Sequence, residues 1–374
     1  MRTRVLFDHQ IFTIQNYGGV SRYFWELMRN AGPKLQCELP VVFSNNLYLR
    51  DGQHTRHRTF FPNTNLPGGW RIIKACNDWA ARKALQRAAF DVFHPTLFDD
   101  DYFLERMPAG KPFVITIHDM IPYLYPEYYP DRELSHLKRV ADRASRIITV
   151  SENTRADAMR LLGLPAERVV VIPHGTTTTE ATGPRPAVPG RYVLYTGTRG
   201  MYKNLGCFLE AASLLHRQHP DLYFVCAGGG PFSLPEQEQL RTLHLTDRVL
   251  QLGPLTDAEL AYLYRDAAAF VFPSHYEGFG LPILEAFAHG CPVVLSAASC
   301  FPEVAQEAAL YFRPDAPQQL AEQLAQVLTD KALRRRLSEA GQLRSQDFTW
   351  ARTTALTRQL YRDAVTEPLV LELT

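Results

Sequence analysis

Short apolar runs alternate with longer segments of helical periodicity along most of this 374-residue chain, and this alternation restricts the fold more than any other feature. A short apolar run between polar turns is typical of a buried strand, whereas apolar residues three or four positions apart indicate a helix. Strand and helix in regular alternation predict a parallel sheet with helices on both faces. In the first half, the strand-like runs lie at 5–7, 39–43, 92–93, 113–117, 147–150 and 169–172.

The alternation is interrupted once, by a run of four threonines followed by three prolines and two glycines. Such a segment neither packs a core nor keeps regular structure. We interpret 177–190 as a linker between an N-terminal domain, 1–176, and a C-terminal domain, 191–346. In the second domain the strand-like runs resume at 192–196, 223–227, 249–252, 270–272 and 292–295. Residues 347–374 have helical spacing and are expected to pack back on the N-terminal domain.

The expected fold is therefore α/β, with two doubly wound Rossmann-like domains facing across a cleft. Ligands of open parallel sheets bind beyond the carboxyl ends of the strands. Two such sheets facing each other would place a small-molecule site between them.

Composition excludes several other classes. Forty lysines and arginines balance 39 aspartates and glutamates, so the formal net charge is +1 and nucleic acid is not an expected partner. Six cysteines without close spacing suit a reducing cytosol. The first residues lack the apolar core of a signal peptide, and no run of about 18 apolar residues occurs. We expect a cytoplasmic protein that is soluble or lies on a membrane without spanning it.

The most informative segment combines a strand-like run, a loop with two glycines and a helix between 270 and 290. Gly278 and Gly280 allow the backbone to approach a ligand, and the N–H groups at a helix start favour phosphate or sugar oxygens. Glu277 lies in the loop and Glu285 lies in the helix, so both carboxylates can point toward one pocket. In the alternative interpretation, the glycines only form a turn and Glu285 faces solvent.

A second pattern, YTGTRGMYKNL, has Arg199 and Lys203 in a loop that opens a helix. The two cations can meet at one anion, such as a diphosphate leaving group whose negative charge grows as its bond breaks. The competing interpretation is a solvated basic loop, and the neighbouring glutamate segment makes it the weaker one.

Two N-terminal patterns also follow strand-like runs. Gly18 and Gly19 open a helix, where backbone amides can bind a phosphate from the other domain. His118 and Asp119 follow the run FVITI at the sheet edge where the cleft is expected, so His118 can orient a sugar hydroxyl. Double glycines usually mark turns, however, and a lone histidine at a strand end is more often structural than catalytic.

Three other patterns fail as sites. The acidic triplet at 99–101 contains an Asp-x-Asp match for a metal-bound diphosphate, but it lacks supporting ligands and is expected to be a polar turn. The glycine run at 228–230 departs from the dinucleotide fingerprint, which disfavours NAD. His216 and His219 lack further zinc ligands.

Taken together, the two alternating halves, Arg199 with Lys203, and EGFGLPILE from Glu277 to Glu285 resemble the retaining nucleotide-sugar glycosyltransferases of family four, which have the GT-B fold. The resemblance covers nearly the whole chain. Its supporting matches are Gly18-Gly19, His118-Asp119 and VIPHG at 171–175. In that family the donor lies mainly on the C-terminal domain and the acceptor on the N-terminal domain.

Carried over by position, the resemblance implies four catalytic residues. Arg199 and Lys203 would neutralise the donor diphosphate. His118 would contact the transferred sugar near the reacting carbon, and Glu277 would bind that sugar. The implied substrate-binding residues are Gly18, Gly19, Asp119, Leu252, Gly278, Phe279, Gly280, Leu281 and Glu285.

Further roles follow from the same resemblance. Glu285 would bind the ribose hydroxyls, and the region around Leu252 would help to enclose the base. The family is also expected to retain anomeric configuration by front-face attack assisted by the leaving phosphate, without a carboxylate nucleophile and without a divalent metal or other cofactor. One departure is Asn204, which follows Lys203 where the family commonly has glycine.

The stretch 70–89 bears on the acceptor, because Trp70, Ile72 and Trp79 lie there among five basic residues. Such a face can bind an anionic membrane, and a packing helix with a solvated basic face is an equal alternative. If it binds membrane, the acceptor is a lipid-linked saccharide at the inner face of the plasma membrane, as in lipopolysaccharide or other surface polysaccharide biosynthesis. The GGVSRYFWELM and YTGTRGMYKNL sequences are most similar to those of mannosyl- or related transferases of polysaccharide clusters. The expected partners are a GDP- or UDP-sugar and a saccharide acceptor.

Two alternatives stay open. A nucleotide-sugar epimerase or a sugar phosphorylase on the same fold would keep the phosphate-binding residues but change the acceptor. A non-catalytic sugar-nucleotide-binding protein would bind donor without turnover, and the joint presence of Glu277, Arg199, Lys203 and His118 argues against it.

Overall fold

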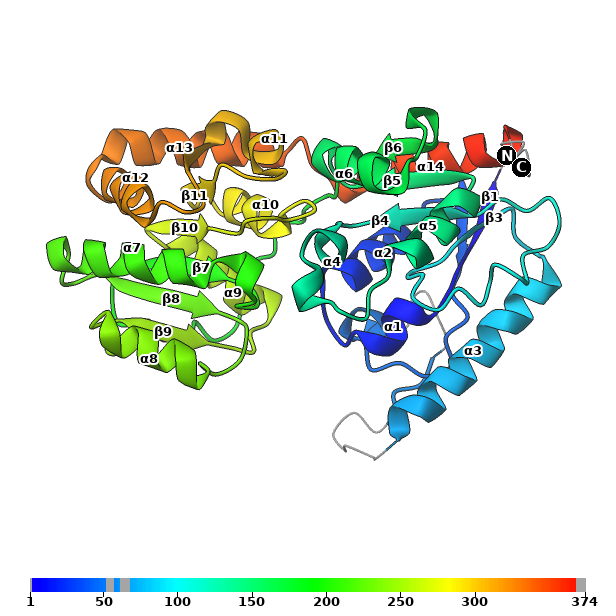
Figure 1. Ribbon diagram of the computed structural model, residues 1–374, viewed down its shortest axis with the longest axis horizontal. Coiled ribbons are helices and arrows are strands. Elements are labelled where there is room, and N and C mark those ends of the chain that lie inside the picture. Colours follow the sequence, from blue (N-terminus) through cyan, green and yellow to red (C-terminus); the bar gives the residue numbers. More distant parts are fainter. Residues whose placement is uncertain (1, 52–56, 61–67, 368–374) are drawn as a thin grey trace. The chain divides into compact units, whose positions relative to one another are not determined.

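The computed structural model describes residues 2–51, 57–60 and 68–367. The chain forms two compact units (Figure 1). Unit 1 takes the chain up to Gly175 together with the last helix from Trp350, and unit 2 runs from Thr176 to Thr349. Every strand pairing within them is parallel, which confirms two doubly wound α/β domains.

Unit 1 contains two three-stranded ladders, ordered β2-β1-β3 and β4-β5-β6. The main-chain N–H of Phe93 donates to the carbonyl of Pro112 at 3.1 Å, beside a parallel bridge between Phe93 and Phe113 that joins the ladders. The strands are β1 (Thr3–Phe7), β2 (Leu35–Glu38), β3 (Val92–His94), β4 (Val114–Ile117), β5 (Arg146–Thr149) and β6 (Val169–Val171).

Helices cover both faces of these ladders. One apolar core joins Ile115 and Ile147 of the strands to Leu85, Val140 and Ala158 of α3, α5 and α6. On the other face α14 packs against α2, β1 and β3 (Figure 1). The helices are α1 (Gln10–Ile14), α2 (Gly19–Arg29), α3 (Gly69–Arg87), α4 (Ile121–Leu124), α5 (Leu134–Arg143), α6 (Glu152–Leu162) and α14 (Trp350–Thr366), with 3-10 turns at Leu47–Asp51, Pro126–Tyr128 and Ala166–Arg168.

Unit 2 has one six-stranded sheet in the order β12-β11-β10-β7-β8-β9. Its strands are β7 (Tyr192–Thr196), β8 (Tyr223–Ala227), β9 (Val249–Leu252), β10 (Ala269–Phe272), β11 (Val293–Ser296) and β12 (Ala309–Phe312). The chain winds from β7 toward β9 and then returns to place β10 on the other side of β7. This reversal creates a switch point, and the loops after β7 and β10 leave the sheet side by side there.

The helices of unit 2 lie on both faces of the sheet. One apolar cluster joins Tyr195 and Phe224 of the strands to Phe208 of α7 and Leu324 of α12. The helices are α7 (Leu205–Gln218), α8 (Leu234–Thr242), α9 (Asp257–Asp266), α10 (Leu281–Ala288), α11 (Phe301–Ala305), α12 (Pro317–Thr329) and α13 (Lys331–Ser345), with 3-10 turns at Met201–Lys203 and Gln306–Ala308.

The prediction of a strand at 39–43 is wrong, because the second strand is Leu35–Glu38. Pro40 has no N–H to donate within a sheet. The N–H groups of Val42 and Phe43 donate instead to Oδ1 of Asn77, at 2.8 and 3.0 Å. A side chain of α3 therefore satisfies the backbone that a neighbouring strand would have paired.

The region around the unit boundary also differs from the expected division. The segment expected as a linker, 177–190, is part of unit 2, where Arg185 pairs with Asp266 at 2.9 Å and the carbonyl of Thr179 lies 2.9 Å from Nε2 of His289. The expected terminal segment, 347–374, is divided, since unit 1 resumes at Trp350. Its residues 368–374 lie outside the described residues.

Candidate active site

Lys203 and Glu277 form an ion pair at the switch point of unit 2. Lys203 lies in the 3-10 turn after β7, and Glu277 lies in the loop after β10. Nζ of Lys203 donates to Oε1 of Glu277 at 2.6 Å, and their side chains are only 13% and 12% exposed. Neighbouring strands thus bring together two residues 74 positions apart in the sequence. The sequence predicted both residues for the site but not the bond between them.

Hydrogen bonds from neighbouring side chains hold both the main chain and the carboxylate of Glu277. The Ser299 hydroxyl accepts from the N–H of Glu277 at 3.3 Å and donates to its carbonyl at 2.6 Å. Cys300 Sγ donates to the same carbonyl at 3.3 Å, and the Ser274 hydroxyl donates to Oε1 of Glu277 at 2.7 Å. The carboxylate is therefore held in one orientation before any ligand binds.

Apolar rings surround the ammonium group of Lys203. Nζ lies 5.2 Å from the ring centre of Tyr202 and 5.3 Å from that of Phe272. Little water reaches the pair, so its electrostatic interaction is stronger than between exposed side chains, and removal of either partner would leave a poorly solvated charge.

Arg199 has a different environment from the one expected. Its Nε donates to Oε1 of Glu236 at 2.7 Å, and its terminal nitrogens donate to the carbonyls of Gly228, Gly230 and Pro231 at 2.8–2.9 Å. The side chain is 5% exposed. The structure therefore does not place Arg199 and Lys203 on a common partner, because Arg199 fastens the glycine-rich loop after β8 to the start of α8.

The glycine-bearing loop into α10 requires glycine at one position. Gly280 has φ of +87°, and a Cβ there would lie 2.9 Å from Cδ1 of Ile283. Gly278 and Phe279 are buried, and the Phe279 ring packs edge-on against Phe348. Leu281 then begins the helix.

Glu285 lies inside α10 and does not simply face solvent. Its Oε2 accepts from the hydroxyl of Tyr264 at 3.2 Å. Leu252 ends β9, and its carbonyl accepts from the N–H of Gly228 at 2.8 Å. Leu252 therefore lies beside the glycine-rich loop that Arg199 fastens.

In unit 1, His118 follows β4 and belongs to an aromatic cluster. Its ring stacks on that of His174, with centres 5.4 Å apart, and contacts the edge of Tyr23 at 5.0 Å. Burial lowers the pKa of His118 to about 3, so the imidazole is neutral near pH 7. Asp119 is beside it, and its Oδ1 accepts from the N–H of Ile121 at 2.9 Å.

Gly18 and Gly19 begin α2, as expected, but a side chain already occupies this helix start. Oε1 of Gln15 accepts from the N–H of Ser21 at 3.0 Å, and a Cβ at Gly18 would lie 2.4 Å from Nε2 of Gln15. Gln15 therefore supplies an oxygen at the place where a phosphate oxygen was expected. Gln15 was not predicted from the sequence, because a glutamine in a loop carries no distinctive pattern.

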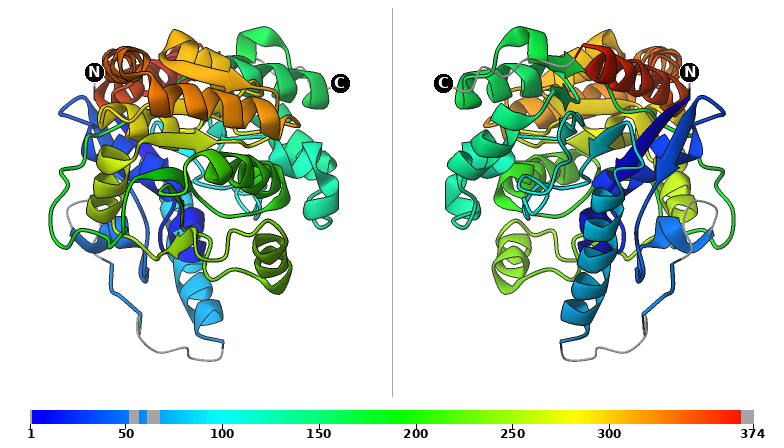
Figure 2. Two further views of the ribbon diagram at one scale, coloured as in Figure 1. Left: turned by 90° about the vertical axis from the view of Figure 1, so that its left-hand side faces the viewer. Right: turned by 90° about the vertical axis from the view of Figure 1, so that its right-hand side faces the viewer.

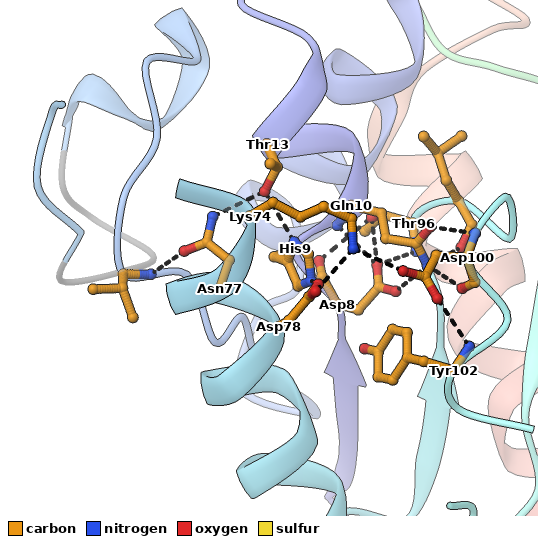
Figure 3. A network of polar contacts seen from close by, with 12 residues as sticks. Asp8, His9, Gln10, Thr13, Lys74, Asn77, Asp78, Thr96, Asp100 and Tyr102 are labelled. Atoms are coloured by element: carbon orange, nitrogen blue, oxygen red, sulfur yellow. Dashed lines mark hydrogen bonds and ion pairs between the residues drawn. The ribbon is translucent and has the colours of Figure 1, made fainter. Parts of the chain in front are cut away.

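A polar network after β1 was also missed (Figure 3). The buried carboxylate of Asp8 accepts from the N–H and hydroxyl of Thr96 at 2.8 and 2.6 Å and from the side chain of Gln10 at 2.7 Å. Burial raises the pKa of Asp8 despite these bonds. Nζ of Lys74 lies 2.8 Å from both Asp78 and Asp100, which ties α3 to the loop after β3.

Each aspartate of the acidic triplet at 99–101 forms an ion pair with a basic side chain. Asp99 pairs with Arg132, Asp100 with Lys74, and Asp101 with Arg139. Within the described residues, no group of three or more His, Cys, Asp and Glu side chains has an arrangement suited to a metal ion.

None of the helices in the described part of the chain combines the length and apolar character needed to cross a bilayer.

Comparisons with known proteins agree with this geometry. Residues 17–180 match glycosyltransferase family 4, and residues 183–344 match the glycosyl transferases group 1. The O-antigen chain mannosyltransferase B of Escherichia coli is 31% identical over 291 residues, covering 72% of this chain and 74% of that protein.

Solved structures share the fold along nearly the whole chain. Sucrose-phosphate synthase from Thermosynechococcus elongatus superposes with a TM-score of 0.73 and 21% identity, covering 98% of this chain and all of the other. Anabaena Alr3699/HepE in complex with UDP-glucose gives a TM-score of 0.71 and 18% identity, with 98% and 100% coverage.

Two doubly wound domains of this kind define the GT-B class of enzymes. Within that class the chain belongs to glycosyltransferase family 4, and it is a glycosyltransferase.

Proposed function

We propose that this glycosyltransferase moves a hexose, preferentially mannose, from a GDP- or UDP-sugar to a saccharide acceptor in surface polysaccharide biosynthesis, with retention of configuration and without a metal ion. The Lys203–Glu277 pair at the switch point of unit 2 carries the proposal. The mannosyltransferase relative from Escherichia coli supports mannose, and the UDP-glucose complex of Anabaena Alr3699/HepE supports a nucleotide-sugar donor.

Lys203 would stabilise the leaving diphosphate. An ammonium group has three N–H donors, and the structure uses one of them for Glu277. The remaining donors can reach phosphate oxygens on which negative charge grows as the glycosidic bond breaks. Because this charge is largest in the transition state, the interaction lowers the barrier more than it strengthens ground-state binding.

Glu277 is better suited to stabilising positive charge than to forming a covalent bond. Its Oε1 accepts from both Lys203 and Ser274, and these bonds stabilise the carboxylate and weaken it as a nucleophile. This supports front-face attack, in which the acceptor hydroxyl bonds to the anomeric carbon and its proton passes to the leaving phosphate. Glu277 would favour the positive charge that develops on the sugar.

We assign the donor to the C-terminal domain, 191–346, and the acceptor to the N-terminal domain, 1–176. The switch point of unit 2 provides the cation, Glu285 of α10 would bind the ribose, and Leu252 at the end of β9 would help to enclose the base. Gly18, Gly19, His118 and Asp119 lie at the starts of α2 and α4 in unit 1. His118, neutral at pH 7, would contact the uncharged sugar.

A transfer assay tests the proposal. The full chain is incubated in EDTA with GDP-mannose or UDP-glucose and with lipid-linked saccharides extracted from bacterial membranes, and the anomeric configuration of the product is read by NMR. We expect acceptor-dependent release of one nucleoside diphosphate and a retained anomeric bond. An altered sugar with donor alone would indicate an epimerase, and cleavage of a saccharide by phosphate would indicate a phosphorylase. Binding without turnover, an inverted product, or turnover abolished by EDTA would contradict the proposal.

The exposed face of α3 supports a peripheral membrane location. Ile72 and Trp79 lie about two turns apart on one side of α3 and are 54% and 62% exposed, Trp70 at the start of the helix is 62% exposed, and the first turns of α3 extend beyond the sheet of unit 1 (Figure 2). The helix has five basic residues and one acid, and Nζ of Lys83 lies 4.9 Å from the ring centre of Trp79. We propose that this face lies on the anionic inner face of the plasma membrane, where a lipid-linked acceptor would be presented.

Vesicle co-sedimentation tests the membrane contact separately. The full chain should bind phosphatidylcholine vesicles only when they contain phosphatidylglycerol, and Trp79→Ala with Lys83→Ala should weaken this binding. Leu343→Ala is the matched control, because Leu343 is 68% exposed but lies in unit 2. Equal binding by all three proteins would contradict the contact.

A further inference from the structure

His118 and His174 come from separate loops of unit 1 and form one stacked pair. His118 follows β4, and His174 lies beyond the end of β6 in the VIPHG sequence. Their ring planes differ by 17°, with centres 5.4 Å apart. Nε2 of His118 is buried and has no hydrogen-bond partner in the described part of the chain. Ring contacts therefore surround a His118 side chain whose Nε2 is not held by a hydrogen bond from the described residues.

Tyr23 supports both rings from α2. Its ring meets the His118 ring edge-on at 5.0 Å and the His174 ring at 5.1 Å. Tyr23 is fully buried, and its hydroxyl lies 3.2 Å from Oγ1 of Thr116. This fixed tyrosine leaves little freedom for either histidine.

The last helix supports His174 from the opposite end of the sequence. The Trp350 ring lies 5.8 Å from the His174 ring, and the Thr353 hydroxyl donates to the carbonyl of Pro173 at 2.8 Å. The chain therefore returns to unit 1 after unit 2 and packs α14 against the loop that carries His174.

We propose that His174 is a positioning residue for sugar transfer: its ring fixes the imidazole of His118 and shields it from water, so that His118 meets the sugar as a neutral group. This inference rests on the proposed function, in which His118 contacts the sugar. His174 itself touches no reacting atom.

The charge state of His118 matters because positive charge grows on the sugar during transfer. An imidazolium at that point would oppose the charge, whereas a neutral ring does not. The titratable and charged groups around the His118–His174 pair are Tyr23 and Arg22 of α2, His94 at the end of β3 and Asp119 beside His118, and Arg22 acts on His174. Burial lowers the pKa of His94 to about 3 and that of His174 well below 6.5, so neither histidine supplies a charge near pH 7.

Two substitutions distinguish the effect of the His174 ring from the effect of its nitrogen atoms. His174→Phe keeps a flat ring against His118, and His174→Ala removes it. His219→Ala in unit 2 is the control. For each full-length protein we would follow the imidazole signals by NMR across pH, assign that of His118 by its loss in His118→Asn, and measure kcat and donor KM between pH 5 and 8.

In His174→Ala we expect the pKa of His118 to rise toward its ordinary value. At pH 5.5, where a histidine of ordinary pKa is about ten parts charged to one neutral, we expect kcat to fall about tenfold, with donor KM within about twofold of wild type. His174→Phe should keep the wild-type titration and rate. The proposal is overturned if His118 titrates alike in wild type and His174→Ala, or if Phe impairs the enzyme as much as Ala.

Separate controls test whether each variant is folded and whether the wild type transfers sugar. All four tryptophans, at 25, 70, 79 and 350, belong to unit 1, so their fluorescence shows whether each variant keeps this unit folded. If the wild type transfers no sugar, the proposed function fails, while the NMR titration still decides whether the His174 ring controls His118.

Discussion

The two units present contrasting environments at the ends of their strands. In unit 2, Lys203 and Glu277 form an ion pair among aromatic rings, and Arg199 is paired with Glu236 nearby. In unit 1, His118 and His174 stack as neutral rings. Unit 2 thus has an ion pair at its switch point, whereas the two histidines that stack in unit 1 are neutral near pH 7.

The proposed function gives each of these environments a different part of a glycosyl donor. A nucleoside diphosphate is highly charged and gains negative charge as it leaves, which suits fixed cations. The transferred sugar is uncharged and gains positive charge, which suits neutral rings and a carboxylate. If the proposal is correct, substitutions in the two units have different effects on sugar transfer.

The largest effect is expected at the ion pair. Lys203→Ala and Glu277→Ala should each lower the turnover number at least about a hundredfold, since each removes charge stabilisation made mainly in the transition state. Steady-state rates of sugar transfer measure this effect, with Lys331→Ala on α13 as the control for loss of a surface lysine. Near-normal rates in folded variants would remove the pair from the site.

Acid should lower the free energy of unfolding of unit 1. Burial lowers the pKa of His94 to about 3 and that of His174 well below 6.5, while both titrate near 6.5 in the unfolded chain. The unfolded state therefore binds more protons below pH 6.5, and stability that is complete above pH 6.5 is lost as the pH falls toward the folded-state values. Each of these two histidines should lower the free energy of unfolding of unit 1 by about 1.4 kcal/mol per pH unit between pH 6 and 5.

Urea unfolding followed by tryptophan fluorescence measures this loss, because every tryptophan lies in unit 1. Hydrogen exchange of peptides from unit 2 provides the comparison. A fluorescence midpoint that stays constant from pH 7 to 5 would show that the buried histidines do not remain neutral.

A smaller and different effect is expected at Arg199. Its guanidinium joins Glu236 to the carbonyls of the 228–231 loop, so Arg199→Ala should loosen that loop and raise donor KM about tenfold while changing kcat less than about threefold. Arg199→Lys should not restore KM, because one ammonium cannot reproduce the planar arrangement of donors. If kcat falls as in Lys203→Ala with KM unchanged, Arg199 contacts the diphosphate directly.

The smallest effect concerns the contact between α14 and the loop of His174. Thr353→Val removes the hydrogen bond to the carbonyl of Pro173 and should lower the free energy of unfolding of unit 1 by about 1 kcal/mol. Thr366→Val, at the exposed end of the same helix, should change it by less than about 0.5 kcal/mol. Tryptophan fluorescence in urea compares the two, and equal effects would contradict a specific role for this contact.

The fold was largely predictable because apolar periodicity determines which segments become strands and helices. The failures have local causes. The run at 39–43 is apolar enough for a strand, but Pro40 and the amide of Asn77 divert its backbone. The strand Ala309–Phe312 was not foreseen, and α8 depends on a capping box between Ser233 and Glu236 after a glycine run that obscures the helix.

The site was predictable only where a motif occurs at one place in the sequence. Glu277 and Lys203 were expected from their own loops, yet their bond depends on which strands become neighbours. The placement of Arg199 could not be foreseen either, because its four acceptors come from residues 228–236. His174 was seen only as part of VIPHG, since stacking between distant loops leaves no sequence pattern.

The most direct test of the division between the units is calorimetric titration of the full chain with GDP-mannose and UDP-glucose in EDTA, for wild type, Lys203→Ala and His118→Asn. We predict that one donor binds the wild type, that Lys203→Ala weakens this binding at least about tenfold, and that His118→Asn changes it less than about threefold. Absence of binding by either donor, or equal losses in the two variants, would contradict the account.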